Sequence, residues 1–93
     1  MIHKNYTLVT GGSGKLGSRI IESQLFQNVL APSKNKLDIT DSNAIFEYFS
    51  KYEIEFVIHC AAITRMKLCK ENPIDAINVN IIGTSNLVNA LLR

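Results

Sequence analysis

The stretch Thr10-Gly11-Gly12-Ser13-Gly14-Lys15-Leu16-Gly17 decides the fold of this chain. An apolar run within residues 5–10 precedes it and predicts a buried strand. Apolar residues with helical spacing follow it and predict a helix over about residues 15–26. These helical residues are Leu16, Ile20, Ile21 and Leu25. A glycine-rich turn between a strand and a helix is typical of dinucleotide binding.

Each of the three glycines at positions 11, 14 and 17 of this turn has an expected physical role. One lets the chain reverse tightly, one lets backbone N–H groups approach a pyrophosphate, and one lets the helix pack close to the strand. The helix N-terminus adds unpaired N–H groups and a partial charge of roughly +0.5, which favour a bound anion. The turn therefore predicts a phosphate-binding site where the first helix begins.

A second predicted helix begins after Thr40 or Asp41, either of which can cap it, and runs to about Tyr52. Its apolar residues recur at offsets of three, four and seven, which predicts a buried stripe. The stripe consists of Ile45, Tyr48, Phe49 and Tyr52. Short apolar runs at 28–31 and 56–58 flank this helix and predict the second and third strands.

The last predicted helix begins at Asn72 and Pro73, a capping side chain followed by a proline at the first helical position. Its apolar stripe, in alternating three- and four-residue steps, is Ile74, Ile77, Ile81, Thr84, Val88 and Leu91. Gly83 lies inside this helix, where glycine costs about 1 kcal/mol relative to alanine. Close packing against the sheet would explain its presence.

The element order β-α-β-α-β-α predicts an α/β fold with three parallel strands. Right-handed crossovers between sequential neighbours place the strands in the order 3-2-1, one half of a Rossmann sheet. We therefore expect residues 1–93 to form a truncated dinucleotide-binding half-domain. In that arrangement strand one has a bare edge, and the last helix lacks packing partners. We expect marginal stability, or association with a second chain or a second copy through that edge.

Composition excludes several functional classes. Apolar residues make up 46% of the 93 residues and charged residues 19%, which indicates a folded domain. A net charge of +2 with scattered basic residues argues against nucleic acid. No apolar run approaches the roughly 20 residues that span a membrane, so a cytoplasmic protein is expected. Cys60 and Cys69 lack metal or redox spacing and are expected to be reduced structural thiols, and His59 is expected to have a structural role.

The chain resembles the extended short-chain dehydrogenase/reductase family, and within it the dTDP-4-dehydrorhamnose reductases. The glycine turn alone is common to many nucleotide-binding folds, but three more stretches match in order and spacing, over nearly the whole chain. The four matching stretches are Val9 to Gly17, Leu37 to Asp41, Val57 to Thr64, and Cys69 to Leu87.

This resemblance implies where a nicotinamide dinucleotide would bind. The glycine turn would hold the pyrophosphate, Asp38 would accept a hydrogen bond from the adenine amine, and Ile39 would pack on the adenine ring. The segment Ala61 to Ile63 would line the ribose and pyrophosphate. The alternatives are a turn-forming role for Asp38 and simple strand-exit packing for Ala61 and Ala62. The expected cofactor contacts are Gly11, Ser13, Gly14, Lys15, Leu16, Gly17, Ser33, Lys34, Asp38, Ile39, Ala61, Ala62 and Ile63.

The end of the second strand bears on the choice between NAD(H) and NADP(H). Many NAD-binding Rossmann proteins place an acid there to bind the ribose 2′-hydroxyl. Here the residues 31–34 include Ser33 and Lys34, and no acid occurs before Asp38. A hydroxyl and a cation suit a 2′-phosphate, so we expect NADP(H) to be preferred and NAD(H) to remain possible. The alternative is that both residues belong to a solvated loop.

The resemblance also implies catalysis by a tyrosine and a lysine four residues later, and the chain lacks this pair. Positions 10, 52 and 56, four residues after Tyr6, Tyr48 and Tyr52, hold no lysine. We expect no catalytic residue and no metal in these 93 residues, and no turnover by them alone. Three interpretations stay open: part of a nucleotide-sugar reductase, epimerase or dehydratase; a non-catalytic cofactor-binding or regulatory module; and a vestigial fragment without a ligand.

Overall fold

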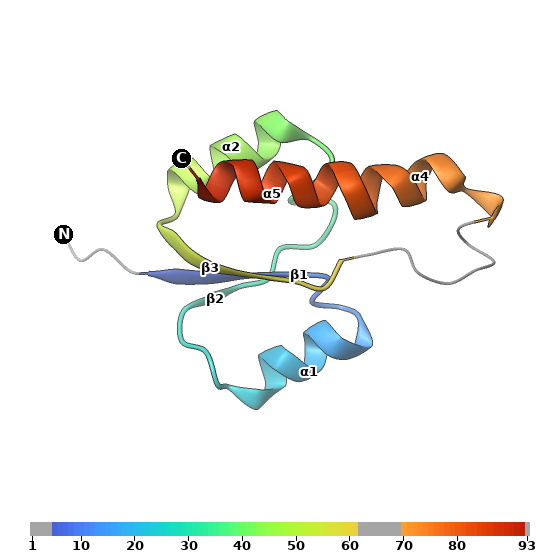
Figure 1. The fold of residues 1–93 in the computed structure, drawn as a ribbon. Helices are drawn as coiled ribbons and strands as arrows, with labels where there is room; N and C mark the ends of the chain where they lie inside the picture. Colours follow the sequence, from blue (N-terminus) through green and yellow to red (C-terminus); the bar gives the residue numbers. More distant parts are fainter. Residues whose placement is uncertain (1–4, 62–69, 93) are drawn as a thin grey trace.

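The computed structural model describes residues 5–61 and 70–92, which form a parallel three-stranded sheet with helices on both faces (Figure 1). The predicted α/β class and the partial Rossmann architecture are confirmed. The elements in chain order are β1 (Tyr6–Thr10), α1 (Lys15–Ser23), β2 (Val29–Leu30), α2 (Ser42–Lys51), β3 (Ile54–His59), α4 (Pro73–Ile77), the π-helical segment η1 (Asn78–Gly83) and α5 (Thr84–Leu91).

The strand order is β2-β1-β3, which corrects the predicted order 3-2-1. The prediction assumed that both crossovers step in the same direction across the sheet. Instead, the connection through α2 reverses direction and passes over β1. Because such crossovers are right-handed, a reversal moves the connecting helix to the opposite face. Figure 1 shows this result, with α1 on one face and α2 on the other.

The central position of β1 also corrects the expected bare edge of strand one. Thr7 and Leu8 pair with the two residues of β2, and the whole of β1 pairs with β3 on its other side. The prediction of association through a bare edge of strand one is therefore wrong, because β2 and β3 pair with the two edges of this strand. Among the described residues, the outer sides of β2 and β3 form the edges of this sheet.

The core lies between the sheet and the layer formed by α2 and α5. Leu8 is fully buried at its centre, and Ile45 of α2 is 1% exposed. The predicted stripe of α2 is confirmed, because Tyr48 and Phe49 pack against this core and Tyr52 contacts the Tyr48 ring. The buried cluster consists of Leu8, Leu37, Ile39, Ile45 and Leu87.

Helix α1 is shorter than predicted and less buried. It ends at Ser23 because Gln24 adopts a left-handed conformation with φ of 57°. The Ser23 hydroxyl donates to the Ile20 carbonyl and accepts from the Leu25 amide, which stabilises this ending. Leu25 therefore lies beyond the helix, and both it and Leu16 are exposed.

The helices α4, η1 and α5 form one long helix. The face that it packs against the core is not the face that carries the predicted apolar stripe. Pro73 occupies the first helical turn as predicted, but the Asn72 side chain makes no capping hydrogen bond. Leu87 and Gly83 are buried, whereas five of the six stripe residues are exposed. These five are Ile74, Ile77, Ile81, Val88 and Leu91. Gly83 packs closely as expected, but against Ile39 of the β2–α2 connection rather than the sheet.

The described residues bear on membrane insertion, metal binding and the state of the thiols. Within residues 5–61 and 70–92, no helix has the length and apolarity to cross a membrane. The same residues contain no cluster of three or more His, Cys, Asp or Glu side chains suited to a metal ion. Cys60 is a free, half-buried thiol, as predicted, and Cys69 lies outside the described residues.

Candidate functional site

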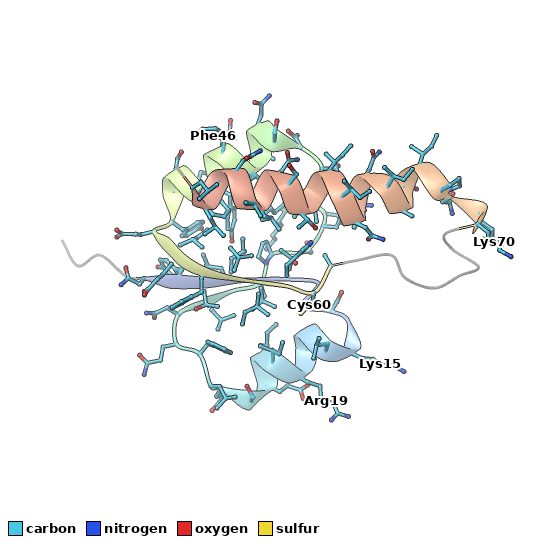
Figure 2. The ribbon with its side chains drawn as sticks, in the orientation of Figure 1. Lys15, Arg19, Phe46, Cys60 and Lys70 are labelled. Carbon is cyan, nitrogen blue, oxygen red and sulfur yellow. The ribbon has the colours of Figure 1, made fainter. Side chains whose placement is uncertain are left out.

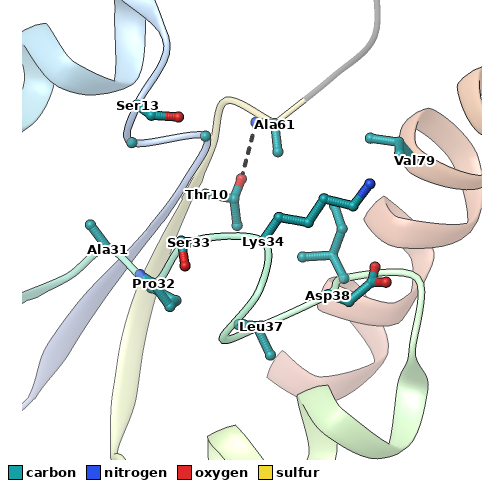
Figure 3. A pocket seen from close by; sticks show the side chains of 13 residues that line it. Thr10, Ser13, Ala31, Pro32, Ser33, Lys34, Leu37, Asp38, Ala61 and Val79 are labelled. Atoms are coloured by element: carbon teal, nitrogen blue, oxygen red, sulfur yellow. Dashed lines mark hydrogen bonds between the residues drawn. The ribbon is translucent and has the colours of Figure 1, made fainter.

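A pocket of about 260 Å³ lies at the carboxyl ends of the three strands (Figure 3). Parallel strands of an α/β sheet bring their exit loops together at this edge, which is where such folds bind ligands. The exits of β1, β2 and β3 each contribute to the wall, and η1 closes one side. The lining residues are Thr10, Gly11, Gly12, Ser13, Ala31, Pro32, Ser33, Lys34, Leu37, Asp38, Ile39, Ala61 and Val79.

Gly11 begins the turn after β1 and needs to be glycine for two reasons. Its φ of +68° lies in the left-handed region, which other residues rarely adopt. A Cβ at this position would also lie 2.7 Å from the Ala61 amide nitrogen, on the exit of β3. The turn then closes with a 3.0 Å hydrogen bond from the Gly14 amide to the Gly11 carbonyl. Gly11 therefore sets the close approach of the two strand exits.

Gly17 and Gly14 differ in what surrounds them. A Cβ on Gly17 would overlap the Gly11 carbonyl oxygen, so this glycine lets α1 pack on the turn. A Cβ on Gly14 would lie 3.4 Å from the same oxygen, which is an ordinary contact, and no other described atom comes within 4 Å. The backbone of Gly14 is extended, with φ of −78°. The protein itself therefore leaves room for a side chain at Gly14, and that room faces solvent.

The N-terminus of α1 carries no side-chain cap. Gly14 occupies the N-cap position without a side chain, and no acidic residue lies in the first turn. The Ser18 amide donates to the Gly14 carbonyl at 2.9 Å. The amides that precede Ser18 in the first turn have no acceptor within the helix, as at the start of any α-helix. Figure 2 shows Lys15 and Arg19 pointing away from the sheet. The positive character of this helix end therefore comes from backbone N–H groups.

Asp38 lies on the pocket wall in the connection between β2 and α2. Its Oδ1 accepts hydrogen bonds from the Thr40 hydroxyl at 2.7 Å and the Thr40 amide at 3.0 Å. These two bonds hold the pKa of Asp38 below its usual value of 3.8, and the positive charge of Lys34 lowers this pKa further. Figure 3 shows Lys34 extending across the pocket towards Asp38 and Val79. The carboxylate is thus fixed through one oxygen, and Oδ2 takes no part in the Thr40 bonds.

A hydrogen-bonded network joins the exits of β1 and β3 to the long helix. The His59 ring contacts the Thr10 hydroxyl through Nδ1 at 2.6 Å and the Thr84 hydroxyl through Nε2 at 2.8 Å. Thr10 Oγ1 also accepts from the amides of Cys60 at 3.1 Å and Ala61 at 3.2 Å, the latter drawn in Figure 3. Burial lowers the pKa of His59 from its usual 6.5. The structural role predicted for His59 is confirmed.

The structure brings seven of the thirteen predicted site residues to the pocket: Gly11, Ser13, Ser33, Lys34, Asp38, Ile39 and Ala61. Four more, residues 14–17, belong to the adjoining turn and the start of α1. Ala62 and Ile63 lie outside the described residues. Six lining residues were not predicted as contacts: Thr10, Gly12, Ala31, Pro32, Leu37 and Val79. Thr10, Ala31 and Pro32 were identifiable as strand-exit residues, whereas Val79 depends on how the long helix packs.

Comparison with known proteins places this fold and pocket in a family. Residues 5–93 match the RmlD substrate binding domain family. The chain belongs to this family. The match covers both the glycine turn and the long helix, so it includes every described element.

Relatives in sequence and structure agree with this assignment. The chain is 34% identical to the GDP-6-deoxy-D-talose 4-dehydrogenase of Aggregatibacter actinomycetemcomitans, over 91% of this chain and 30% of the relative. A dTDP-4-dehydrorhamnose reductase structure from Clostridium acetobutylicum is 34% identical, with a TM-score of 0.85 over 94% of this chain and 32% of that one. The dTDP-4-dehydrorhamnose reductase of Bacillus anthracis, solved in complex with NADP, is 26% identical, with a TM-score of 0.84 over 97% of this chain and 33% of that one.

The chain spans about a third of the length of the relatives that it matches. The chain is a domain of the RmlD family, and its resemblance to dTDP-4-dehydrorhamnose reductases seen in the sequence is confirmed.

Proposed function

We propose that this domain binds a nicotinamide dinucleotide, with NADP(H) preferred, in the pocket at the carboxyl ends of its strands. The diphosphate would lie against the Gly11–Gly17 turn, and the adenosine would lie between the β2 exit and Ile39. The observation that carries this proposal is the open space at Gly14, in front of an α-helix whose N-terminus has no side-chain cap. An unfilled helix N-terminus favours an anion because its first N–H groups lack partners.

The wall opposite the glycine turn supports an adenosine site. Ile39 and Leu37 supply an apolar surface, and both are more than nine-tenths buried in the fold. Asp38 is held through Oδ1, which leaves Oδ2 to accept a hydrogen bond from an exocyclic amine. Its lowered pKa keeps this carboxylate ionised at neutral pH, as such an acceptor requires.

The β2 exit supports the choice of NADP(H). Ser33 and Lys34 line the pocket directly after β2, where an NAD-specific site would place an acid. A lysine ammonium on a flexible stem can pair with a 2′-phosphate, which carries nearly two negative charges. A solved relative that contains NADP agrees with this choice.

The proposal does not extend to turnover by these 93 residues. The sequence contains no Tyr-x-x-x-Lys pair for proton donation and ribose binding. The dinucleotide would therefore be bound without a positioned general acid. Activity on a nucleotide sugar would require residues that this sequence does not contain.

The direct test is calorimetric titration of the purified chain with NADP⁺ and with NAD⁺. We expect saturable binding of both, with NADP⁺ binding more tightly. Gly14→Val should weaken NADP⁺ binding at least about tenfold, because a β-branched side chain would occupy the space beside the N–H groups of α1. Absence of saturable binding by either nucleotide would contradict the proposal.

A matched control separates the turn from a general effect of valine in α1. Glu22 is exposed near the other end of this helix, so Glu22→Val should leave NADP⁺ binding unchanged. Thermal unfolding of both variants should show that they remain folded. Equal affinities for Gly14→Val and the unmodified chain would rule out the glycine turn as the diphosphate site.

A further inference from the structure

The His59 ring, at the end of β3, is held from both sides. Nδ1 lies 2.6 Å from Thr10 Oγ1 at the end of β1, and Nε2 lies 2.8 Å from Thr84 Oγ1 at the start of α5. The ring therefore joins two neighbouring strands to the helix that packs over them. Within the described residues, no buried side-chain nitrogen or oxygen is left without a hydrogen-bond partner.

The partners of each hydroxyl assign the proton on the ring. Thr84 donates its hydroxyl proton to the Asn80 carbonyl at 2.9 Å, so its oxygen must accept from the ring, and Nε2 carries a proton. Thr10 Oγ1 already accepts from the Cys60 and Ala61 amides, so its own proton is free to go to Nδ1. The neutral Nε2–H tautomer is the form that satisfies every one of these groups.

A second proton on the ring would break this set of hydrogen bonds. Nδ1 would change from acceptor to donor and would point its proton at Thr10 Oγ1. That oxygen has two lone pairs, which already accept from the Ala61 amide and from the Cys60 amide, and the Cys60 amide also donates to the Thr10 carbonyl at 3.1 Å. Either the ring contact or an amide contact would be lost, and the Thr10 proton would lose its acceptor. A buried polar group without a partner is costly.

The same residues form walls of the nucleotide pocket. Thr10 and Ala61 line it directly, and Thr84 bonds to Asn80, the neighbour of the lining residue Val79 on η1. Two residues beyond Thr84, the Asn86 side chain donates to the Ile39 carbonyl at 2.9 Å. The ring thus joins the β1 exit, the β3 exit and the helix that supports the adenosine side.

We propose that neutral His59 is a positioning residue for the nucleotide pocket, holding Thr10, Ala61 and Thr84 in place, and that protonation of this ring weakens nucleotide binding. This inference rests on the proposed dinucleotide site. It adds a regulatory property to that site, an affinity that falls as the solution becomes acidic.

The surroundings of the ring make His59 the group that titrates. Its hydrogen-bond partners on β1 and α5 are uncharged threonines, and the adjacent titratable group is the Cys60 thiol, directly after β3. Across the pocket, Asp38 and Lys34 are charged, but neither contributes to the lowered pKa of His59, which arises from burial. Asp38 stays mostly ionised down to about pH 3.8, because its hydrogen bonds with Thr40 hold its pKa below that value.

The test measures the ring and the nucleotide together. NMR of the ¹⁵N-labelled chain should show His59 as the Nε2–H tautomer, with His3 distinguished by the spectrum of His59→Asn. Adding saturating NADP⁺ at pH 7.5 and then lowering the pH should move the protonation midpoint of His59 to a lower pH, since linkage is reciprocal. Burial holds the pKa of the folded His59 ring below 6.5, and as the pH falls below that pKa the Kd for NADP⁺ should rise by up to about tenfold per pH unit.

Two variants control for the 2′-phosphate of NADP⁺, which titrates near pH 6. With the His59→Asn variant the 2′-phosphate of NADP⁺ still titrates, but the imidazole ring is absent. The Kd of this variant for NADP⁺ should therefore rise less on acidification than that of the unmodified chain. Thr84→Val removes the acceptor of the Nε2 proton and should weaken NADP⁺ binding at pH 7.5, whereas Thr84→Ser should restore it. NADP⁺ binding without a shift of the His59 midpoint would overturn this inference alone. Absence of NADP⁺ binding at pH 7.5 would overturn the proposed function, and this inference with it.

Discussion

Gly83 in η1 lies so close to Ile39 that a Cβ on the glycine would come within 2.6 Å of Ile39 Cδ1 and 2.7 Å of Cγ1. The Asn86 side chain in α5 donates a hydrogen bond to the Ile39 carbonyl and so holds the same residue. The long helix therefore supports the pocket wall directly, through the close packing of Gly83 on Ile39 and the hydrogen bond from Asn86. Wide π-helical turns often occur near functional sites, and here the π segment carries both Gly83 and the lining residue Val79.

Gly83→Ala should lower the free energy of unfolding by about 1–3 kcal/mol, the usual cost of overpacking. Alanine normally stabilises a helix relative to glycine by about 1 kcal/mol, so a net loss would show that the contact with Ile39 dominates. Ile39 is 8% exposed and has little room to move away. Urea unfolding followed by circular dichroism measures this change.

Gly14→Ala is the matched control, because the added methyl group has space. Its free energy of unfolding should stay within about 0.5 kcal/mol of the unmodified chain. Equal stability of Gly83→Ala and Gly14→Ala would show that Ile39 adjusts without cost, contrary to the packing seen in the fold.

Gly17→Ala should be far more damaging than Gly14→Ala. Its Cβ would overlap the backbone oxygen of Gly11, and a carbonyl on a closed turn cannot swing aside as a side chain can. We expect a loss of at least about 3 kcal/mol, which would unfold a marginally stable domain. Thermal unfolding followed by circular dichroism checks this. A variant as stable as Gly14→Ala would contradict the role given to Gly17.

The sequence predicted the elements well because local patterns determine them. The Asp41 cap shows this, since its carboxylate accepts from the Asn43 and Ala44 amides as the capping pattern requires. The strand order was not predictable from neighbouring elements, because the direction of each crossover depends on which face of the sheet its helix covers. The apolar stripe of the long helix was misleading for a related reason. Periodicity identifies an apolar face but not what covers it.

The pocket was predicted in part for the same reasons. Gly11 and Ala61 follow strands and were expected at the carboxyl edge, where they lie. Val79 could not be found from its own surroundings in the sequence, because it reaches the pocket through the packing of η1 against Ile39. The link between Thr10 and His59 joins residues 49 positions apart, so only the paired strands bring them together.

Stability should decrease as the pH falls below about 6.5, because the folded state keeps His59 neutral. The pKa of the folded ring is lowered from 6.5, so the unfolded chain binds a proton first. The stabilisation from the neutral ring is complete above about pH 6.5 and is lost progressively down to the folded pKa. Urea unfolding at pH 7.5, 6.5 and 5.5 measures this, and His59→Asn should show a smaller decrease. A decrease of the same size in both chains would assign it to other groups.

Thr40→Val should raise the pKa of Asp38 towards 3.8, because the hydroxyl bond is the largest cause of its lowering. The backbone bond from residue 40 and the charge of Lys34 remain, so the pKa should stay below that of a free aspartate. Carboxyl ¹³C NMR during an acid titration measures it. Thr40→Ser keeps the hydroxyl and should leave the pKa unchanged. An unchanged pKa in Thr40→Val would assign the effect to the backbone amide instead.

Lys34→Gln should reduce the preference for NADP⁺ over NAD⁺ about tenfold, equivalent to about 1.4 kcal/mol, because it removes a cation that can pair with a 2′-phosphate. Lys36 belongs to the same loop but does not line the pocket, so Lys36→Gln should leave the preference unchanged. Calorimetric titrations at low and high salt measure both variants, and the effect of Lys34 should shrink as salt screens the charge. Equal losses of NADP⁺ and NAD⁺ affinity in Lys34→Gln would instead place this lysine near a group that both nucleotides share, such as the diphosphate.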